Sequence, residues 1–401
     1  MFFQRKKNHQ KRLWGLRVTT PSIASSSLEE QDFQQQRHPP PNGQRCIDQE
    51  TSSLMNCCRS GTSTSNSLLD LNNLHVYKLF CALTKKLKEH QLQTLCQAVE
   101  QNNVLDGQST HCVLVPRGVI EGEEPHVIAC RIWRWPDIRY ADELKRIPSC
   151  PNERDPVYVC CNPSHWSHRL IRSETPPPPY CIFAMDRLKP EDRAPSEDRY
   201  GGYDQFPGSL TTDGEDTTST TGWCQLAYWE LSQRVGGLFP VENAAVNVFA
   251  EQARGNGLCL STLAMQRISA TPDAVLKARQ KIGLGVTLSR EADGVWLYNR
   301  SSAPVFVHSP TLNDIDTRTL VYRVPPGHCL RAFDHNKAAT EAFAWPSYLA
   351  GAQTGPVDIY SVRISFAKGW GPKYQRQEVT ACPCWLEVHL QKKLLHLRPC
   401  R

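Results

Sequence analysis

A stretch without hydrophobic periodicity, residues 173–222, interrupts the chain and most constrains how it can fold. It contains four consecutive prolines at positions 176–179 and a Thr-rich run that ends at Thr221. This composition is typical of linkers, because it cannot bury enough apolar surface to offset the entropy lost on folding. The sequence therefore predicts two domains in the 401-residue chain, one on each side of the linker.

The N-terminal residues 1–66 are rich in Gln, Ser and Pro, and we expect them to form a disordered tail. A basic cluster in this tail, from Arg5 to Arg12, has two interpretations. It is either a nuclear-import signal or a solvated run of charge, and the sequence leaves both open.

The first domain is predicted over residues 67–172. It begins with a helix that carries a leucine at every fourth position from Leu79 to Leu87. Two short apolar runs, residues 112–116 and 126–133, then predict strands. The domain is expected to be small and of mixed α and β type.

The second domain is predicted over residues 223–391, with a short tail at 392–401. Many short apolar segments predict a β-sandwich with appended helices. The predicted strands are 227–230, 258–260, 286–289, 295–298, 305–308, 320–324 and 362–366. A helix is predicted over 273–282, ending at Gly283.

The cysteine content bears on the compartment. The N-terminus lacks the apolar core of a secretion signal, so we expect an intracellular protein whose 17 cysteines are thiols or metal ligands rather than disulfides.

No run of 18 apolar residues occurs, which argues against membrane insertion. The net charge of +6 is too small for a general nucleic-acid coat, so anion binding should be local.

Several potential metal ligands cluster in the first domain. Cys150, Cys160, Cys161 and His165 lie within 16 residues, and Cys112 lies 38 residues upstream of Cys150. Three thiolates and one imidazole suit tetrahedral zinc. Buried thiols beside an ordinary histidine would give the same spacing, so spacing alone leaves both interpretations open. Of the adjacent pair, only one cysteine normally points at a given ion.

The linker contains a proline–tyrosine motif, PPxY, formed by Pro177, Pro178 and Tyr180. Consecutive prolines preform a polyproline II helix, which loses little entropy when it docks into the aromatic groove of a WW domain. The alternative is a stiff spacer, the usual role of proline-rich linkers.

Cations in the second domain indicate an anion-binding surface. Lys277 and Lys281 are four residues apart on one helix face, with Arg279 turned away. A Gly-rich loop supplies the remaining cations, which are Lys368, Lys373 and Arg376. They suit a phosphorylated partner, although a solvated basic face would have the same composition.

No catalytic motif is present. The sequence lacks HExxH, GxSxG and a Walker loop, and the Cys382–Pro383–Cys384 segment is typical of packing in an apolar strand. We therefore predict that the protein is not an enzyme.

Two strings in the first domain resemble the MH1 domain of SMAD signalling proteins. They are HVIACRIWRWPD at residues 126–137 and VCCNPSH at residues 159–165. The resemblance implies a zinc-stabilised α/β fold and a Zn²⁺ cofactor. The ligands that it implies are Cys112, Cys150, Cys160 and His165.

The same resemblance implies a basic, DNA-reading β-hairpin at residues 116–125. Here this stretch has one arginine and three glutamates, which would repel a duplex. We therefore expect DNA binding to be weak or absent. A DNA-binding transcriptional regulator of the activating or co-mediator SMAD type remains the alternative function.

Residues 290–302 and 366–371 resemble the SMAD MH2 domain, and the VWLYNRSS string resembles its inhibitory branch. The implied fold is a β-sandwich flanked by a loop–helix region and a helical bundle. The resemblance also implies a basic groove that binds activated type I receptor kinases. The groove residues that it implies are Lys277, Lys281, Lys368 and Arg376; Lys373 is added on its charge alone.

An inhibitory SMAD is a non-catalytic antagonist of transforming-growth-factor-β and bone-morphogenetic-protein signalling. The resemblance implies that it blocks receptor-activated and co-mediator SMADs, and that its PPxY motif recruits HECT-type ubiquitin ligases. The chain ends without the Ser-Ser-x-Ser switch of receptor-activated SMADs. We expect a nuclear and cytoplasmic protein that is recruited to receptors at the plasma membrane. A ligase adaptor for unrelated targets is a third possibility.

Overall fold

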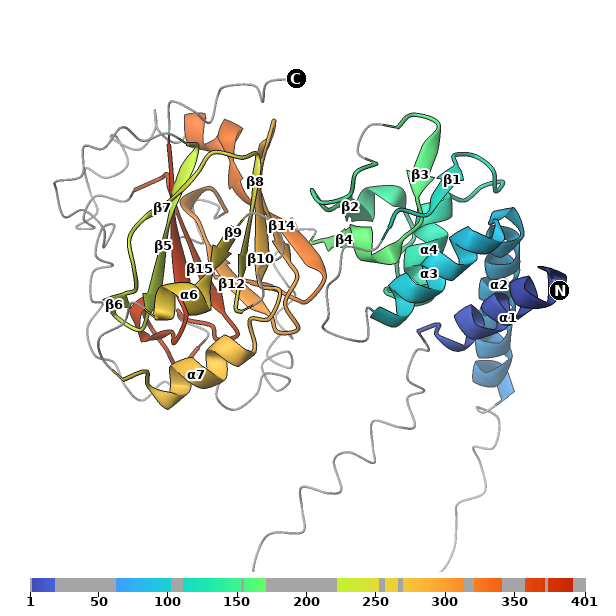
Figure 1. The fold of residues 1–401 in the computed structure, drawn as a ribbon, viewed down its shortest axis with the longest axis horizontal. Helices are drawn as coiled ribbons and strands as arrows, with labels where there is room; N and C mark the ends of the chain where they lie inside the picture. The colour runs from blue at the N-terminus through green and yellow to red at the C-terminus, as the bar shows by residue number, and fades with distance from the viewer. Residues whose placement is uncertain are drawn as a thin grey trace, which may run out of the picture. The chain divides into compact units, whose positions relative to one another are not determined.

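The structure of this chain is a computed structural model. It describes residues 2–18, 63–101, 111–152, 155–170, 222–251, 257–265, 270–312, 321–340, 358–371 and 374–391. These residues form two compact units, each considered by itself below (Figure 1). No helix in the described ranges has the length and apolar character needed to cross a bilayer.

The N-terminal elements are mainly helical. The helices are α1 (Phe2–Gly15), α2 (Ser63–Lys86), α3 (Glu89–Gln101) and α4 (Pro125–Trp133). The leucines that predicted a helix lie on its inner face, where Leu83 and Leu87 are almost completely buried. Leu92 and Leu95 of α3 are buried with them. The prediction of a helical start is confirmed, although α2 begins earlier than expected.

The expectation of a disordered tail over residues 1–66 is wrong for its first part, because α1 is a helix. Leu13 is fully buried, and the Trp133 indole donates a hydrogen bond to the Leu13 carbonyl at 3.0 Å. The ring of Trp14 lies 5.1 Å from that of Phe80. Two apolar residues are thus enough to anchor a helix whose other side chains are mostly polar.

The strand predicted over residues 126–133 is wrong, since this segment forms α4. All of its side chains except Arg131 are buried. A segment buried on every side has neither helical nor strand periodicity, so its sequence pattern cannot distinguish the two. Pro125 in the first turn favours a helix start, because its missing N–H would have no partner there.

The remaining elements of this region are short. They are β1 (Leu114–Pro116), η1 (Ala141–Glu143), β2 (Leu144–Arg146), β3 (Tyr158–Cys160), η2 (Pro163–His165) and β4 (Trp166–Arg169). Strand β1 pairs with β3, and β2 with β4, both antiparallel. The β-hairpin expected at residues 116–125 is absent: these residues form turns that lead from β1 directly into α4.

The second compact unit is built on two sheets, and their orders are β2-β4-β14-β11-β10-β8-β9 and β13-β12-β15-β16-β5-β6, with β7 beside β5. Strands β2 and β4 therefore belong to this unit, although they precede the linker in the sequence. The bounds of its first strands are β5 (Cys224–Glu230), β6 (Gln233–Arg234), β7 (Phe239–Val241), β8 (Ala245–Phe249), β9 (Gly257–Cys259), β10 (Val286–Glu291) and β11 (Gly294–Asn299). The later strands are β12 (Val305–His308), β13 (Tyr322–Val324), β14 (His328–Asp334), β15 (Ser361–Phe366) and β16 (Trp385–Leu390). The helices are α6 (Leu260–Ala264), α7 (Asp273–Gln280), η5 (Pro310–Leu312) and η7 (Val379–Ala381).

The core of this domain lies between the two sheets. Leu288 and Leu297 of one sheet and Ile364 and Leu386 of the other are fully buried in it. Alternate residues of a strand face the same side of its sheet. The strands of this domain could therefore be predicted from alternating or continuous apolar residues in the sequence. The predicted sandwich, and with it the mixed α/β two-domain fold, is confirmed.

Two sequence expectations change in detail. The strand predicted over residues 258–260 ends at Cys259, and Leu260 already begins α6. The predicted helix also ends earlier than residue 282: α7 ends at Gln280, and Gly283, which has a φ of +52°, lies beyond it. Gly285 also has a positive φ, and a Cβ there would overlap the carbonyl oxygen of Val248. Only glycine therefore allows the chain to pass this close to β8.

Candidate functional site

The candidate metal ligands are positioned by two pairs of short strands. Cys112 precedes β1, and Cys160 ends the paired strand β3. Cys150 lies beyond β2 in a turn, where its backbone N–H donates to the Ile147 carbonyl at 3.1 Å. His165 ends η2, immediately before β4. One candidate ligand lies at or near an end of each of these four strands, so residues that are distant in sequence come close together in space.

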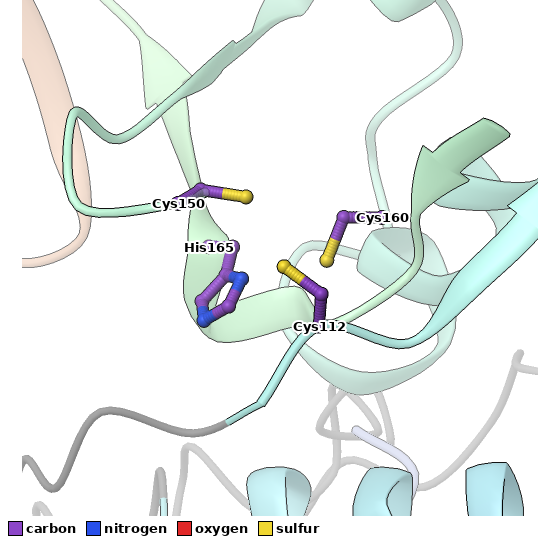
Figure 2. A group of neighbouring side chains, drawn as sticks. All are labelled: Cys112, Cys150, Cys160 and His165. Carbon is purple, nitrogen blue, oxygen red and sulfur yellow. The ribbon is translucent and has the colours of Figure 1, made fainter. Parts of the chain in front are cut away.

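The four side chains point toward a common centre (Figure 2). The ligand atoms of Cys112, Cys150, Cys160 and His165 all lie within 4.8 Å of one another. Cys112 is partly buried and the other three are buried. Three sulfurs and one imidazole nitrogen make a closed donor set of the kind that holds a structural metal ion. The structure therefore brings together all four residues that the resemblance implied.

Neither of the other two cysteines nearby belongs to the cluster. Cys161 is fully buried, and burial raises the pKa of its thiol well above the usual value. Cys130, in α4, is also fully buried, and burial raises the pKa of its thiol to about 12. Because successive residues of an extended chain point to opposite sides, Cys160 faces the cluster and Cys161 faces the core. The ambiguity of the adjacent pair is resolved in favour of Cys160.

The basic residues of helix α7 lie on two different faces of the helix. Val275 and Ala278 are buried against the sandwich, whereas Lys277 and Lys281 are exposed. Arg279 points inward, as the helical spacing predicted, and pairs with Glu230 of β5. The exposed lysines are therefore available to a partner, while Arg279 forms an ion pair within the domain.

The Gly-rich loop that follows β15 is shaped by buried aromatic side chains. Trp370 and Tyr374 are buried in a cluster with Trp385 of β16. The backbone N–H of Gly371 donates to the Arg376 carbonyl at 2.7 Å, which closes the loop. Lys368 and Arg376 are each partly exposed.

The Cys382–Pro383–Cys384 segment links the helix and the loop. The Cys382 thiol lies 3.7 Å from the Lys368 carbonyl, and the Cys384 thiol lies 3.7 Å from the Val275 carbonyl. Burial raises the pKa of these thiols to about 11 and about 12, so both stay protonated near neutral pH. The segment is structural, as its sequence indicated, and it holds both groups of cations at one end of the sandwich.

A buried ion pair fixes α7 to this end of the sandwich. Glu230 is fully buried, accepts a hydrogen bond from the Tyr228 hydroxyl at 3.0 Å, and contacts Arg279. Burial alone would lower the pKa of Arg279, but the hydrogen bond and charge of Glu230 outweigh it, so the pKa is raised. The pair lies 49 residues apart in sequence, and no local signal predicts it.

We expect Glu230→Ala to destabilise the second domain by about 3–5 kcal/mol, because it leaves the Arg279 charge buried without its partner. Urea unfolding followed by tryptophan fluorescence measures the loss. The matched control is Gln280→Ala, an exposed neighbour on the same helix, which should change stability by less than about 0.5 kcal/mol. The double variant Glu230→Ala/Arg279→Met should recover part of the loss. Wild-type stability of Glu230→Ala would contradict the role of the pair.

The acidic stretch between β1 and α4 pairs its charges internally. Arg117 lies 3.5 Å from Glu124, and Glu123 lies 2.9 Å from Arg131 of α4. The one arginine that precedes these glutamates is therefore already engaged by a carboxylate. The charges of this stretch are thus partly neutralised within the domain, and weak DNA binding stays a prediction.

Some predicted site residues lie outside the described residues. These are Lys373 of the loop and the PPxY residues Pro177, Pro178 and Tyr180. Conversely, Leu276 was not singled out, although it is 44% exposed beside Lys277. Asp273, Gln280 and Lys281 complete this outward face at helical spacing, which is the signal that could have found it.

Comparison with known families matches both domains. The MH1 domain matches residues 76–170, and the MH2 domain matches residues 221–391. The chain is 42% identical over 326 residues to Mothers against decapentaplegic homolog 6 of Gallus gallus, covering 77% of this chain and 73% of that protein. It is 40% identical over 336 residues to homolog 7 of Homo sapiens, covering 77% and 76%. Dwarfin sma-3 of Caenorhabditis elegans is 31% identical, with 68% and 74% covered.

Among solved structures, the IAD domain of interferon regulatory factor 9 gives a TM-score of 0.29 at 12% identity. The match covers 42% of this chain and 81% of that one, and the similarity is too slight to support an argument. The family matches and the sequence relatives agree on one class, proteins that combine an MH1 and an MH2 domain. The chain belongs to the SMAD family and, within it, to the inhibitory SMADs. This membership supports an antagonist role in transforming-growth-factor-β and bone-morphogenetic-protein signalling.

Proposed function

We propose that this chain suppresses these pathways by occupying activated type I receptor kinases through the basic groove of its MH2 domain. Occupation would block receptor-activated SMADs from the receptor and limit their assembly with co-mediator SMADs. The observation that carries the proposal is the placement of cations by one buried segment. Cys382–Cys384 holds the loop of Lys368 and the helix of Lys277 and Lys281 at one end of the sandwich.

The groove residues suit a phosphorylated ligand. Lys277 and Lys281 are exposed one helical turn apart, and their ammonium groups would form charge-assisted hydrogen bonds to phosphate oxygens. Lys368 and Arg376 would extend this surface along the loop. The phosphorylated juxtamembrane region of a type I receptor would supply such phosphate groups.

The PPxY motif supplies the second part of the mechanism. Pro177, Pro178 and Tyr180 would bind a WW domain of a HECT-type ubiquitin ligase. Because the same chain would hold both receptor and ligase, the local concentration of the ligase at the receptor would rise. The protein would accordingly act in the cytoplasm and nucleus and at receptors in the plasma membrane.

The metal centre would hold Zn²⁺. Cys112, Cys150, Cys160 and His165 provide the Cys₃His set that this ion prefers, and no position is left for a reacting water. When bound, the ion supplies a structural cross-link between the β1–β3 and β2–β4 strand pairs. The four side chains themselves exclude solvent, since three of them are buried.

A SMAD-responsive reporter in cells with a constitutively active type I receptor tests the proposal. We expect the protein to lower the reporter signal, and a rise in signal would overturn the antagonist role. Tyr180→Ala should leave partial inhibition, because receptor occupancy does not need the ligase. Complete loss of inhibition in Tyr180→Ala would instead favour an adaptor that acts only through ubiquitination. Receptor ubiquitination, measured in parallel, should fall in this variant.

A further inference from the structure

Two lysine-bearing segments that are far apart in sequence lie side by side in the first domain. The Lys6 ammonium donates to the Leu87 carbonyl at 2.9 Å, and the Trp14 ring lies 4.9 Å from that of Tyr77. Helix α1 crosses α2 (Figure 1), with Lys6 near the end of α2 and Trp14 nearer its middle. The basic cluster of the N-terminal segment thereby joins the lysines of α2.

The outward side chains of the two helices form one surface, which we name the lysine face. On α1, Lys7 and Lys11 are exposed and one turn apart. On α2, residues 74, 78 and 85 share a helix face, with position 77 at its edge. The lysine face comprises Lys7, Lys11, Lys78 and Lys85 together with Leu74 and Tyr77.

The described side chains of the two helices supply no carboxylate of their own to these charges. Helix α1 contains no acidic residue, and none occurs from Asn73 to Lys88. The nearest charge pair joins Arg12 to Glu100 of α3, on another side of α1. The exposed lysines of the lysine face therefore have no acidic neighbour within their own helical segments, in contrast to the internally paired turns after β1.

Exposed apolar side chains among the lysines indicate the kind of partner. Leu74 is 50% exposed and Tyr77 is 47% exposed. A duplex backbone offers phosphates to the lysines but no apolar environment to Leu74. A bilayer interface offers both, since anionic headgroups attract lysine while leucine and tyrosine enter the boundary below them. Arginine, the usual reader of guanine, is also absent from this set.

We propose that the lysine face binds membrane surfaces rich in anionic phospholipid, which would hold the first domain against the membrane independently of any receptor contact. The association is peripheral, because four lysines and two apolar side chains cannot anchor a chain permanently. The proposal does not rest on the receptor groove, which involves other residues in the other domain.

Co-sedimentation of the full chain with vesicles tests the proposal. We expect binding to vesicles of phosphatidylcholine with phosphatidylserine, and little binding to phosphatidylcholine alone. Lys7→Glu with Lys78→Glu should weaken binding to the anionic vesicles roughly tenfold or more, because each reversal replaces attraction by repulsion. Leu74→Ser should weaken it roughly threefold without any change in charge.

The matched control is Arg234→Glu with Arg323→Glu, which makes the same charge change at exposed positions of the second domain and should leave vesicle binding unchanged. Titration with a fluorescent DNA duplex is the second arm, in which Leu74→Ser should have no effect. Undiminished vesicle binding by the Lys7/Lys78 variant overturns the proposal. A second result would also overturn it: Leu74→Ser binds vesicles as the wild type does, and the lysine reversals abolish duplex binding. That combination would assign the surface to nucleic acid.

Discussion

Replacing Cys160 by serine should unfold the first domain and release the zinc ion that we propose it holds. Structural zinc contributes about 10–16 kcal/mol of apparent binding free energy in small domains, which is comparable to the whole stability of a domain. Losing one of four ligands removes much of this contribution. Metal analysis of the purified chain should give one zinc per wild-type molecule and a substoichiometric amount for Cys160→Ser. Circular dichroism should show loss of helix in the variant.

The adjacent cysteine provides a matched control. Cys161 is as buried as Cys160 but faces the core, so Cys161→Ala should retain full metal and lose only about 1–2 kcal/mol of stability. Chelator treatment of the wild-type chain should reproduce the Cys160→Ser result, and added zinc should reverse it. A Cys160→Ser chain with a full complement of zinc would rule out this ligand set.

Reversing the two exposed charges of α7, in Lys277→Glu with Lys281→Glu, should weaken binding to a phosphorylated receptor juxtamembrane peptide by about a hundredfold or more. Each lysine would lose a charge-assisted hydrogen bond and gain a repulsive carboxylate. Fluorescence anisotropy with the phosphorylated and unphosphorylated peptides measures the change. Binding by the wild-type chain should also weaken as salt is raised, because exposed charges are screened.

The control for this experiment reverses two exposed arginines elsewhere in the domain, Arg234 and Arg323. It carries the same change in net charge, so a specific groove predicts wild-type affinity for it. Lys368→Glu with Arg376→Glu should resemble the lysine variant in the peptide assay. Normal peptide capture by both groove variants would remove the basis for receptor docking through this surface.

The sequence predicted those parts of the fold and of the candidate metal site whose signals lie within a short segment of the chain. The strands of the sandwich show alternating or continuous apolar residues, and α7 has clear start and stop signals around Asp273 and Gly283. The candidate metal ligands were found because three cysteines and a histidine cluster within 16 residues, and the family strings then selected four of the five candidates. Strand geometry explains why Cys161 is the one left out.

The remaining features depend on contacts that no local pattern encodes. Helix α4 is buried nearly all round, so the run from Pro125 to Trp133 has lost the periodicity that would identify it. Helix α1 has a polar sequence, and its contacts with Phe80 and Trp133, which are distant in sequence, help to make it part of the domain. The ion pair of Glu230 and Arg279 likewise forms only once β5 and α7 are in place.

The docking of α1 makes the first domain discontinuous along the chain. Its N-terminal anchor, Leu13, is separated from α2 by residues 19–62, which connect two elements of one packed unit. The entropy cost of closing such a connection grows slowly, by about 0.6 kcal/mol for each doubling of its length. Insertions and deletions between these two elements should therefore be well tolerated. A fragment that begins at Ser63, by contrast, would leave the rings of Phe80 and Trp133 without their cover and should be poorly soluble.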